Sequence, residues 1–216
     1  MSAALYPLFL NLQGRVCVVI GGDEMAEAKL RDLLETKAKL RVIASEVTAQ
    51  IAAWAEEGRL EWEARAYENG DLSDAFLVVS TADRDTTSRV YDEAETRHVL
   101  CNAVDDIPHC NCFASAVVRR GPLQIAISTA GNSPALAQRL RKELEQQFGE
   151  EYSSWVQRLG ELRSQLFQDE SLDRETRRRM LHEQASESAL ETYRCSIGTV
   201  CTCQNSIDPE GRGKSS

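Results

Sequence analysis

The sequence lacks long hydrophobic runs and concentrated blocks of basic residues. No stretch approaches the roughly 18–20 consecutive apolar residues that a membrane-spanning helix needs. The opening residues, MSAALYPLFLNLQGR, lack the basic segment that precedes the apolar core of a secretory signal, so we expect a cytoplasmic protein without a membrane partner. The 25 Lys and Arg residues face 34 Asp and Glu residues, and the resulting net charge of −9 predicts no nucleic-acid partner, because such binding relies on basic side chains that neutralise phosphates.

The composition also excludes fibrous and disordered chains. Contents of 42% hydrophobic and 27% charged residues are those of an ordinary globular protein, and 216 residues correspond to between one and two domains. Cys17 and Cys101 stand in apolar, strand-like runs, where cysteine behaves as a small buried hydrophobic residue. The cysteine-containing segments 109–112 and 195–203 lack the paired C-x-x-C spacing of a zinc site, so we expect no metal site.

Strand-like and helix-like segments alternate through the first half of the chain. The run RVCVVI from Arg15 ends in two glycines, and residues 24–36 then place apolar side chains at helical spacing. Further strands are predicted at 40–44, 60–64, 76–80 and 99–104, with helices at 47–58 and 84–97. Strands separated by helices imply parallel pairing with right-handed crossovers. The predicted fold class is therefore α/β, with a Rossmann-type doubly wound parallel sheet.

The alternation ends after Val104. Two apolar runs, 113–118 and 123–128, flank the sequence RRGP and predict a β-hairpin. Pro134 then opens a helix, because proline lacks only an N–H that would be unpaired in the first turn, and three amphipathic stretches continue to about Tyr193. Residues 195–216 are polar and aperiodic, so we expect a disordered tail there.

The turn after the first strand occupies the place where a dinucleotide pyrophosphate normally meets the exposed amides of a helix N-terminus. It reads Gly21-Gly22-Asp23-Glu24-Met25-Ala26. Gly21 and Ala26 fit the pattern G-x-G-x-x-G/A, but Asp23 stands at the middle glycine, which lets a phosphate approach the backbone. A carboxylate there repels phosphate unless it turns to solvent or caps the helix. The alternative is a sheet of this shape that binds no nucleotide.

Ser45 and Glu46 follow the second predicted strand, where an acidic residue hydrogen-bonds the ribose hydroxyls of a dinucleotide. In that role Glu46 selects NAD over NADP. The alternative is a surface glutamate that the dipole of the following helix stabilises.

Four motifs occur in one order along the chain: YPLFLNLQGRVCVVIGG, CNAVDD, RRGPL and STAGNSPALAQRLRKELE. In combination, from about Tyr6 to Phe167, they resemble the precorrin-2 dehydrogenase family, which is the dehydrogenase/chelatase part of siroheme synthase. The resemblance implies NAD-dependent oxidation of precorrin-2, a tetrapyrrole, to sirohydrochlorin in siroheme biosynthesis. Some members also act as ferrochelatases, with ferrous iron as a further substrate. The other function considered is a degenerate tetrapyrrole-binding or carrier protein that has lost NAD through Asp23.

The resemblance also implies a domain organisation and a homodimer. We expect an NAD-binding Rossmann domain at 1–112, a dimerisation and substrate-binding segment at 113–149, a helical domain at 150–194 and the tail at 195–216. By position, the cofactor would be held by Gly21, Gly22, Asp23, Glu24, Met25, Ser45, Glu46, Thr81 and Ala82.

Asp105 in CNAVDD corresponds to the key aspartate of that family. It follows a parallel strand, at the edge where α/β sheets bind their ligands. We therefore expect Asp105 to be the catalytic base that takes the proton as hydride leaves for NAD. The alternative is that Asp105 only caps a loop or turn.

The segment before Pro134 carries hydroxyls and amides that suit the carboxylates of a substrate. The expected substrate-binding residues are Asn102, Ser128, Thr129, Gly131, Asn132 and Ser133. Helix capping by Asn132 or Ser133 is the alternative, and it is compatible with binding. Relative to the family, this chain departs by having Ala130 in place of a frequent glycine and Cys112 in place of a frequent aromatic residue.

Overall fold

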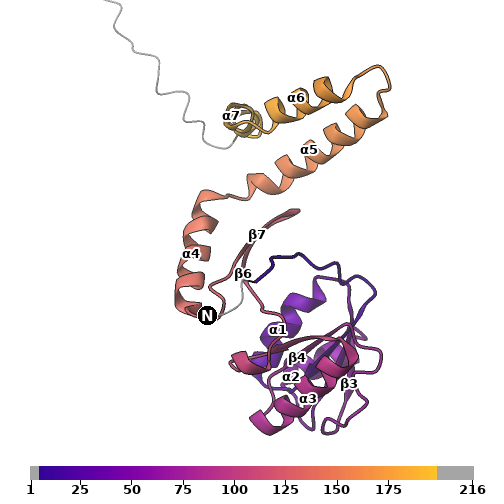
Figure 1. Cartoon of the computed structure of the whole chain (residues 1–216). Helices are drawn as coiled ribbons and strands as arrows, with labels where there is room; N and C mark the ends of the chain where they lie inside the picture. Colours follow the sequence, from indigo (N-terminus) through magenta and orange to yellow (C-terminus); the bar gives the residue numbers. More distant parts are fainter. Residues whose placement is uncertain (1–4, 199–216) are drawn as a thin grey trace, which may run out of the picture. The chain divides into compact units, whose positions relative to one another are not determined.

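The computed structural model describes residues 5–198 and divides the chain into two compact units. Of the described residues, the first unit contains 5–114 and Ser128–Ser133, and the second contains Ser115–Ile127 and 134–198. Figure 1 shows the elements of each unit. This grouping differs from the four predicted parts, because the hairpin and the C-terminal helices form one unit and the loop 128–133 belongs with the sheet.

Five parallel strands form the sheet of the first unit in the order β3-β2-β1-β4-β5. They are β1 (Val16–Ile20), β2 (Lys39–Ile43), β3 (Glu61–Glu63), β4 (Leu77–Ser80) and β5 (Leu100–Ala103). The central strand β1 is registered against both neighbours, and Val19 stands opposite Val42 on one side and Val79 on the other. The predicted α/β, Rossmann-type doubly wound sheet is therefore confirmed.

Helices cover both faces of this sheet because β1 is buried on both faces. They are α1 (Glu24–Leu34), α2 (Ala49–Glu56) and α3 (Arg84–Arg97). Successive side chains of a strand point to opposite faces, so the two halves of the β1 pattern enter different clusters. One buried cluster includes Cys17, Val19, Leu30 of α1 and Ile51 of α2, and the other includes Val18, Ile20, Cys101 and Val90 of α3. Cys17 and Cys101 are fully buried, as predicted.

A buried carboxylate on α3 anchors the loop between β3 and β4. Glu93 is 6% exposed and accepts hydrogen bonds from the Tyr67 hydroxyl at 2.5 Å, the Gly70 amide at 3.0 Å and the Arg97 guanidinium at 2.5 Å. Burial acts to raise the pKa of Glu93, but these hydrogen bonds and the charge of Arg97 outweigh it and hold the pKa below its usual value. The ionised carboxylate therefore ties the loop to the helix.

Replacing Glu93 with Gln is expected to lower the free energy of unfolding at pH 7 by about 2–3 kcal/mol, because the amide loses charge-assisted bonds and presents N–H groups to donors. Since the folded pKa is lowered, the stabilisation is present above the unfolded value of about 4.3 and is lost as the pH falls through the folded pKa. Urea unfolding at several pH values should show that the difference in free energy of unfolding between the parent and Glu93→Gln becomes smaller in acid. Asp92→Asn on the same helix is the control, with an effect within about 0.5 kcal/mol. A difference in free energy of unfolding that does not depend on pH would contradict this account.

The second unit contains a hairpin followed by helices. The strands β6 (Ala116–Arg120) and β7 (Leu123–Ile127) pair antiparallel, and Gly121 with φ +55° makes the turn. Four helices follow in the described residues, α4 (Pro134–Gln147), α5 (Glu151–Gln168), α6 (Arg174–Gln184) and α7 (Glu187–Ser196). The region predicted to be helical up to about Tyr193 is helical, and Asp173 and Ser186 each cap a new helix within it. Residues 195 and 196 belong to α7, and the predicted tail beyond residue 198 lies outside the described residues.

Charged side chains hold this second unit together. Arg120 at the end of β6 donates to the carbonyls of Phe148 at 2.8 Å and Glu145 at 3.0 Å, which satisfies the C-terminal end of α4. Arg194 of α7 pairs with Glu151 of α5 at 2.6 Å. Of the helices in residues 5–198, none has the length and apolar character needed to cross a membrane.

Candidate active site

The predicted cofactor residues and the predicted base all follow strands of the parallel sheet. Because the strands are parallel, their carboxyl ends meet at one edge, and ligands of such sheets bind where the strand order reverses. Here the reversal lies between β1 and β4, which pair in register up to Ile20 opposite Ser80. The loops that begin at Gly21 and Thr81 therefore leave the sheet side by side.

Two glycines allow the turn after β1 to pass close to its neighbours. Gly21 has φ +121°, and a Cβ on it would lie 2.2 Å from Oγ1 of Thr81. A Cβ on Gly22 would lie 2.1 Å from the carbonyl oxygen of Glu46. The turn is thus packed between the loops after β4 and β2, and the structure brings these four predicted residues together.

Asp23 caps α1. Its Oδ1 accepts hydrogen bonds from the Ala26 amide and from the Thr81 hydroxyl, both at 2.9 Å. The sequence left open whether the Asp23 side chain turns to solvent or caps the helix, and in the structure it caps the helix. The carboxylate lies where the positive end of the helix dipole favours an anion, so a pyrophosphate that approaches this turn meets its charge.

The remaining predicted cofactor residues lie around this turn. Glu24 and Met25 are the first two residues of α1, and both are exposed. Ser45 and Glu46 are exposed just beyond β2, and no group in residues 5–198 hydrogen-bonds the Glu46 carboxylate. Ala82 is half-buried, and its carbonyl accepts a hydrogen bond from the Thr87 hydroxyl at 3.2 Å.

Asp105 lies just beyond β5 in a left-handed conformation, with φ +60°. Aspartate tolerates this conformation better than most residues, yet it costs about 1 kcal/mol or more. The carboxylate is exposed and receives no hydrogen bond from any residue of the described part of the chain. The capping alternative therefore finds no support in the structure.

The next residues form a short turn with its own side-chain hydrogen bond. Asp106 Oδ2 lies 2.8 Å from Nδ1 of His109, whose ring packs edge-on against Tyr91. Sequence reasoning missed this pair, although its i, i+3 spacing was an available signal. Within residues 5–198, no three His, Cys, Asp or Glu side chains are arranged to hold a metal ion.

Asn102 does not direct its amide toward open space. Its Nδ2 donates to the Cys112 carbonyl at 3.1 Å, so the side chain is engaged in holding the chain beyond the turn. The amide oxygen of Asn102 has no partner within residues 5–198, so a part in substrate binding stays a prediction.

The loop 128–133 lies against the Asp105 turn. A Cβ on Gly131, which has φ +77°, would lie 2.7 Å from Cδ1 of Ile107, two residues beyond Asp105. Hydrogen bonds close the loop on itself: Thr129 accepts from the Asn132 amide at 2.9 Å and from the Ser133 amide at 3.1 Å. The Ala130 amide donates to Ser128 Oγ at 3.1 Å. The predicted substrate loop therefore contacts Ile107, two residues beyond the predicted base.

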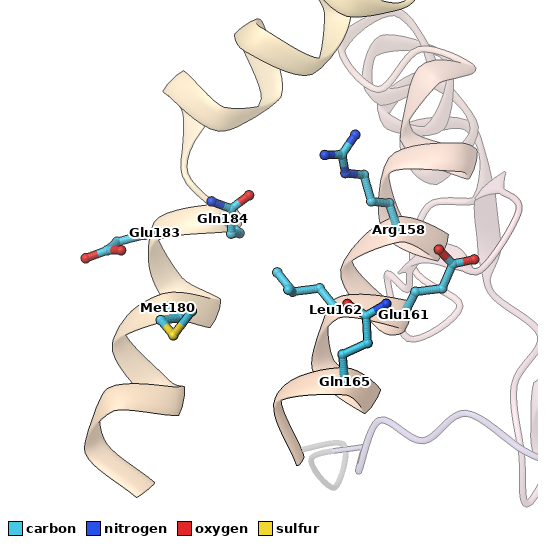
Figure 2. Close-up of a pocket in the computed structure, with 7 residues that line it drawn as sticks. All are labelled: Arg158, Glu161, Leu162, Gln165, Met180, Glu183 and Gln184. Atoms are coloured by element: carbon cyan, nitrogen blue, oxygen red, sulfur yellow. The ribbon is translucent and has the colours of Figure 1, made fainter. Parts of the chain in front are cut away.

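A separate hollow of about 430 Å³ lies in the second unit between α5 and α6 (Figure 2). It is lined by Arg158, Glu161, Leu162, Gln165, Met180, Glu183 and Gln184. Figure 2 shows Leu162 directed from α5 toward α6. No predicted site residue lines this hollow, and its wall mixes carboxylates with a guanidinium, so no one charge sign would select a ligand.

Comparisons with known proteins agree with this arrangement. Residues 8–116 match the family described as "Putative NAD(P)-binding", and residues 120–147 match the family described as "Sirohaem biosynthesis protein central". Siroheme synthase 1 of Cronobacter sakazakii is 41% identical over 140 residues, which are 64% of this chain and 30% of that protein. Siroheme synthase 2 of Yersinia enterocolitica is 35% identical over 164 residues, 76% of this chain and 35% of that protein. The solved structure titled "SirC, precorrin-2 dehydrogenase" has a TM-score of 0.69 at 24% identity, covering 91% of this chain and 100% of that one.

A dinucleotide-binding sheet followed by a central sirohaem-biosynthesis segment defines the class of protein. The chain belongs to the family formed by the N-terminal precorrin-2 dehydrogenase/chelatase region of siroheme synthase, which confirms the resemblance that its motifs indicate. The chain spans about a third of the length of these curated relatives, and the likeness to SirC shows the shared fold.

Replacing Asp23 with Gly is expected to tighten NAD binding about fivefold at low salt. One unit charge near a phosphate, at the screening of a surface site, amounts to about 1 kcal/mol, and the substitution also releases the Ala26 amide. Glycine is itself an acceptable N-cap, so the helix loses only a few tenths of a kcal/mol.

Isothermal titration of NAD into both proteins measures this effect. Glu24→Gln is the matched control, because it removes the same charge one residue away without touching the cap, and its dissociation constant should change less than about twofold. Equal or weaker binding by the Gly variant would show that Asp23 points away from a bound dinucleotide or that the turn binds none.

Proposed function

We propose that this chain is an NAD-dependent precorrin-2 dehydrogenase that forms sirohydrochlorin in siroheme biosynthesis. The observation that carries the proposal is the juxtaposition at one sheet edge of a dinucleotide-type turn, the exposed Asp105 carboxylate and the loop 128–133. The family matches and the relatives named siroheme synthase support the same conclusion.

The residues around the first turn fit a dinucleotide. The backbone amides of Glu24 and Met25 lie at the N-terminus of α1, where a pyrophosphate is favoured. Glu46 would accept hydrogen bonds from the ribose hydroxyls and repel the additional phosphate of NADP, which favours NAD. Thr81 and Ala82 would border the nicotinamide side. When bound, NAD supplies the acceptor for a hydride.

Asp105 would accept the proton that the dehydrogenation releases. Two electrons and one proton leave precorrin-2 as hydride, and a second proton leaves for a base. The carboxylate is exposed and receives no competing hydrogen bond within residues 5–198, and the loop 128–133 contacts Ile107, two residues further along the chain. The hydroxyls and amides of that loop would bind the substrate's carboxylates and orient it toward Asp105.

The same cleft would serve iron insertion. Placing ferrous iron in sirohydrochlorin requires the loss of pyrrole N–H protons, and the Asp105 carboxylate is placed to accept them. We therefore include sirohydrochlorin ferrochelatase as a second activity of this site, with iron as a substrate.

A second candidate function follows from the position of Asp23. Because its carboxylate already occupies the N-terminus of α1, the chain would act as a tetrapyrrole-binding or carrier protein if NAD failed to displace it. Calorimetric titration of NAD tests the proposal. Binding together with NADH formation from precorrin-2 supports the enzyme, whereas tetrapyrrole binding without NAD binding supports the carrier.

Asp105→Asn is expected to keep the melting temperature within a few degrees and to reduce precorrin-2 oxidation roughly 100-fold or more, the usual effect of losing a general base. Asparagine is nearly isosteric and also tolerates the left-handed conformation at φ +60°, whereas alanine would add strain there.

Stopped assays of NADH formation and NAD titration of the same samples make this measurement. Asp106→Asn is the neighbouring control, because it removes the next carboxylate, which pairs with His109, and should cost much less activity. A parent-like rate in Asp105→Asn with intact NAD binding would remove Asp105 from the role of base.

We also propose a homodimer built on the hairpin. A two-stranded sheet leaves two edges with unpaired backbone groups, and in residues 5–198 no further strand extends β6 or β7. Light scattering at micromolar concentration is expected to give about twice the chain mass of 24.1 kDa. The double substitution Val117→Lys and Ala126→Lys, on cross-strand neighbours, should favour the monomer through charge repulsion. A monomeric parent protein would contradict the proposed assembly.

A further inference from the structure

The thiol of Cys110 reaches back from beyond the Asp105 turn to the end of β5. Its Sγ accepts a hydrogen bond from the Ala103 amide at 3.2 Å and donates to the Ala103 carbonyl at 3.1 Å. It also lies 3.5 Å from the Asp106 carbonyl. One side chain therefore contacts the backbone on both sides of Asp105.

The Asp105 carboxylate depends on its neighbours for its position. It is exposed and has no hydrogen bond of its own in the described part of the chain, so nothing on the side chain sets its direction. The backbone of the turn is only loosely closed, since the Asp106 amide lies 3.5 Å from the Ala103 carbonyl. The thiol of Cys110 adds a second donor to that same carbonyl.

The chain beyond the turn is fastened to β5 and so holds Cys110 in place. The amides of Asn111 and Cys112 donate to the Cys101 carbonyl at 3.0 and 3.2 Å. Asn102 donates to the Cys112 carbonyl from the same strand. Cys110 thus bridges a fixed segment and a strained turn.

The other described thiols differ from Cys110 in their contacts. Cys17 is fully buried among apolar side chains, and Cys112 forms no thiol hydrogen bond within residues 5–198. The fully buried Cys101 thiol donates to the His109 carbonyl at 3.7 Å but makes no hydrogen bond to residues 103–106. Burial raises the pKa of Cys110 despite the opposing Ala103 amide, so at neutral pH the group is a thiol that can donate. Its contacts suit a structural hydrogen bond better than nucleophilic chemistry.

We propose that Cys110 is a positioning residue for the reaction: it holds the backbone from Ala103 to Asp106 and thereby sets the direction of the Asp105 carboxylate. The kinetic part of this inference rests on the proposed dehydrogenase function, whereas the structural part does not.

The test compares four variants of the full chain. Cys110→Ala removes all the hydrogen-bond contacts of Sγ, which join it to Ala103, Asp106 and the Asn102 side chain. Cys110→Val removes them while retaining the side-chain volume, and Cys110→Ser retains a group that donates and accepts. Cys112→Ala is the matched control, because it truncates a thiol two residues away that forms no hydrogen bond in the described residues. Thermal melting identifies which variants fold. If Cys110→Ala does not fold, Cys110→Val takes its place in the comparison.

Hydrogen exchange measures the turn without reference to catalysis. We expect the Ala103–Asp106 amides to exchange about tenfold faster in Cys110→Ala and Cys110→Val, and at near-parent rates in Cys110→Ser and Cys112→Ala. Unchanged exchange in both the Ala and Val variants would overturn the inference. This result holds even if the parent protein fails to oxidise precorrin-2, an outcome that would overturn only the proposed function.

Kinetics then test whether the residue acts through Asp105. We expect kcat for precorrin-2 oxidation to fall about tenfold in Cys110→Ala with KM for NAD unchanged, because a misdirected base loses rate more than binding. Cys110→Ser should recover most of this loss, and Cys112→Ala should remain within about twofold of the parent. Added to Asp105→Asn, Cys110→Ala should cause no further loss. If Cys110→Ala lowers kcat by a further tenfold in the Asp105→Asn protein, the inference that Cys110 acts through Asp105 is overturned.

Discussion

The parallel pairing of β1 with β2 on one side and β4 on the other is the constraint on which the rest of this structure depends. Parallel neighbours require crossovers, and the burial of both faces of β1 draws α1 and α2 to one face and α3 to the other. The strand order therefore reverses beside β1. The loops that begin at Gly21 and Thr81 meet there so closely that a β-carbon on Gly21 has no room. The position of the site is a consequence of this topology.

The Asp23 carboxylate has two opposing effects on the turn after β1. The Asp23 carboxylate satisfies an amide of α1 and the Thr81 hydroxyl, which together stabilise the helix start by about 1 kcal/mol. The same helix dipole and amides would attract a pyrophosphate. If the turn binds a dinucleotide as proposed, the contacts of Asp23 that stabilise the unliganded turn would lower the affinity for it.

Asp105, unlike Asp23, has no side-chain hydrogen bond in the described residues. This residue adopts a strained backbone conformation and contributes no side-chain hydrogen bond within residues 5–198, so it adds little to stability. The hydrogen bonds that stabilise this turn come from its neighbours: Asp106 is hydrogen-bonded to His109, and the Cys110 thiol donates to the Ala103 carbonyl. An exposed carboxylate without hydrogen-bond partners in residues 5–198 can accept a proton without breaking a structural contact, as the proposed base would have to do.

The sequence by itself determined the elements of the sheet and its family, because β-branched runs and helical spacing report which faces are buried; the predicted helix 84–97 coincides with α3. Periodicity carries no such information about polar side chains in turns. The Asp23–Thr81 bond joins residues 58 positions apart, and only the tertiary structure decided it, because the crossovers choose which loops share an edge. The return of Cys110 to β5 was likewise undetermined by sequence, since an irregular turn gives its side chains no repeating direction.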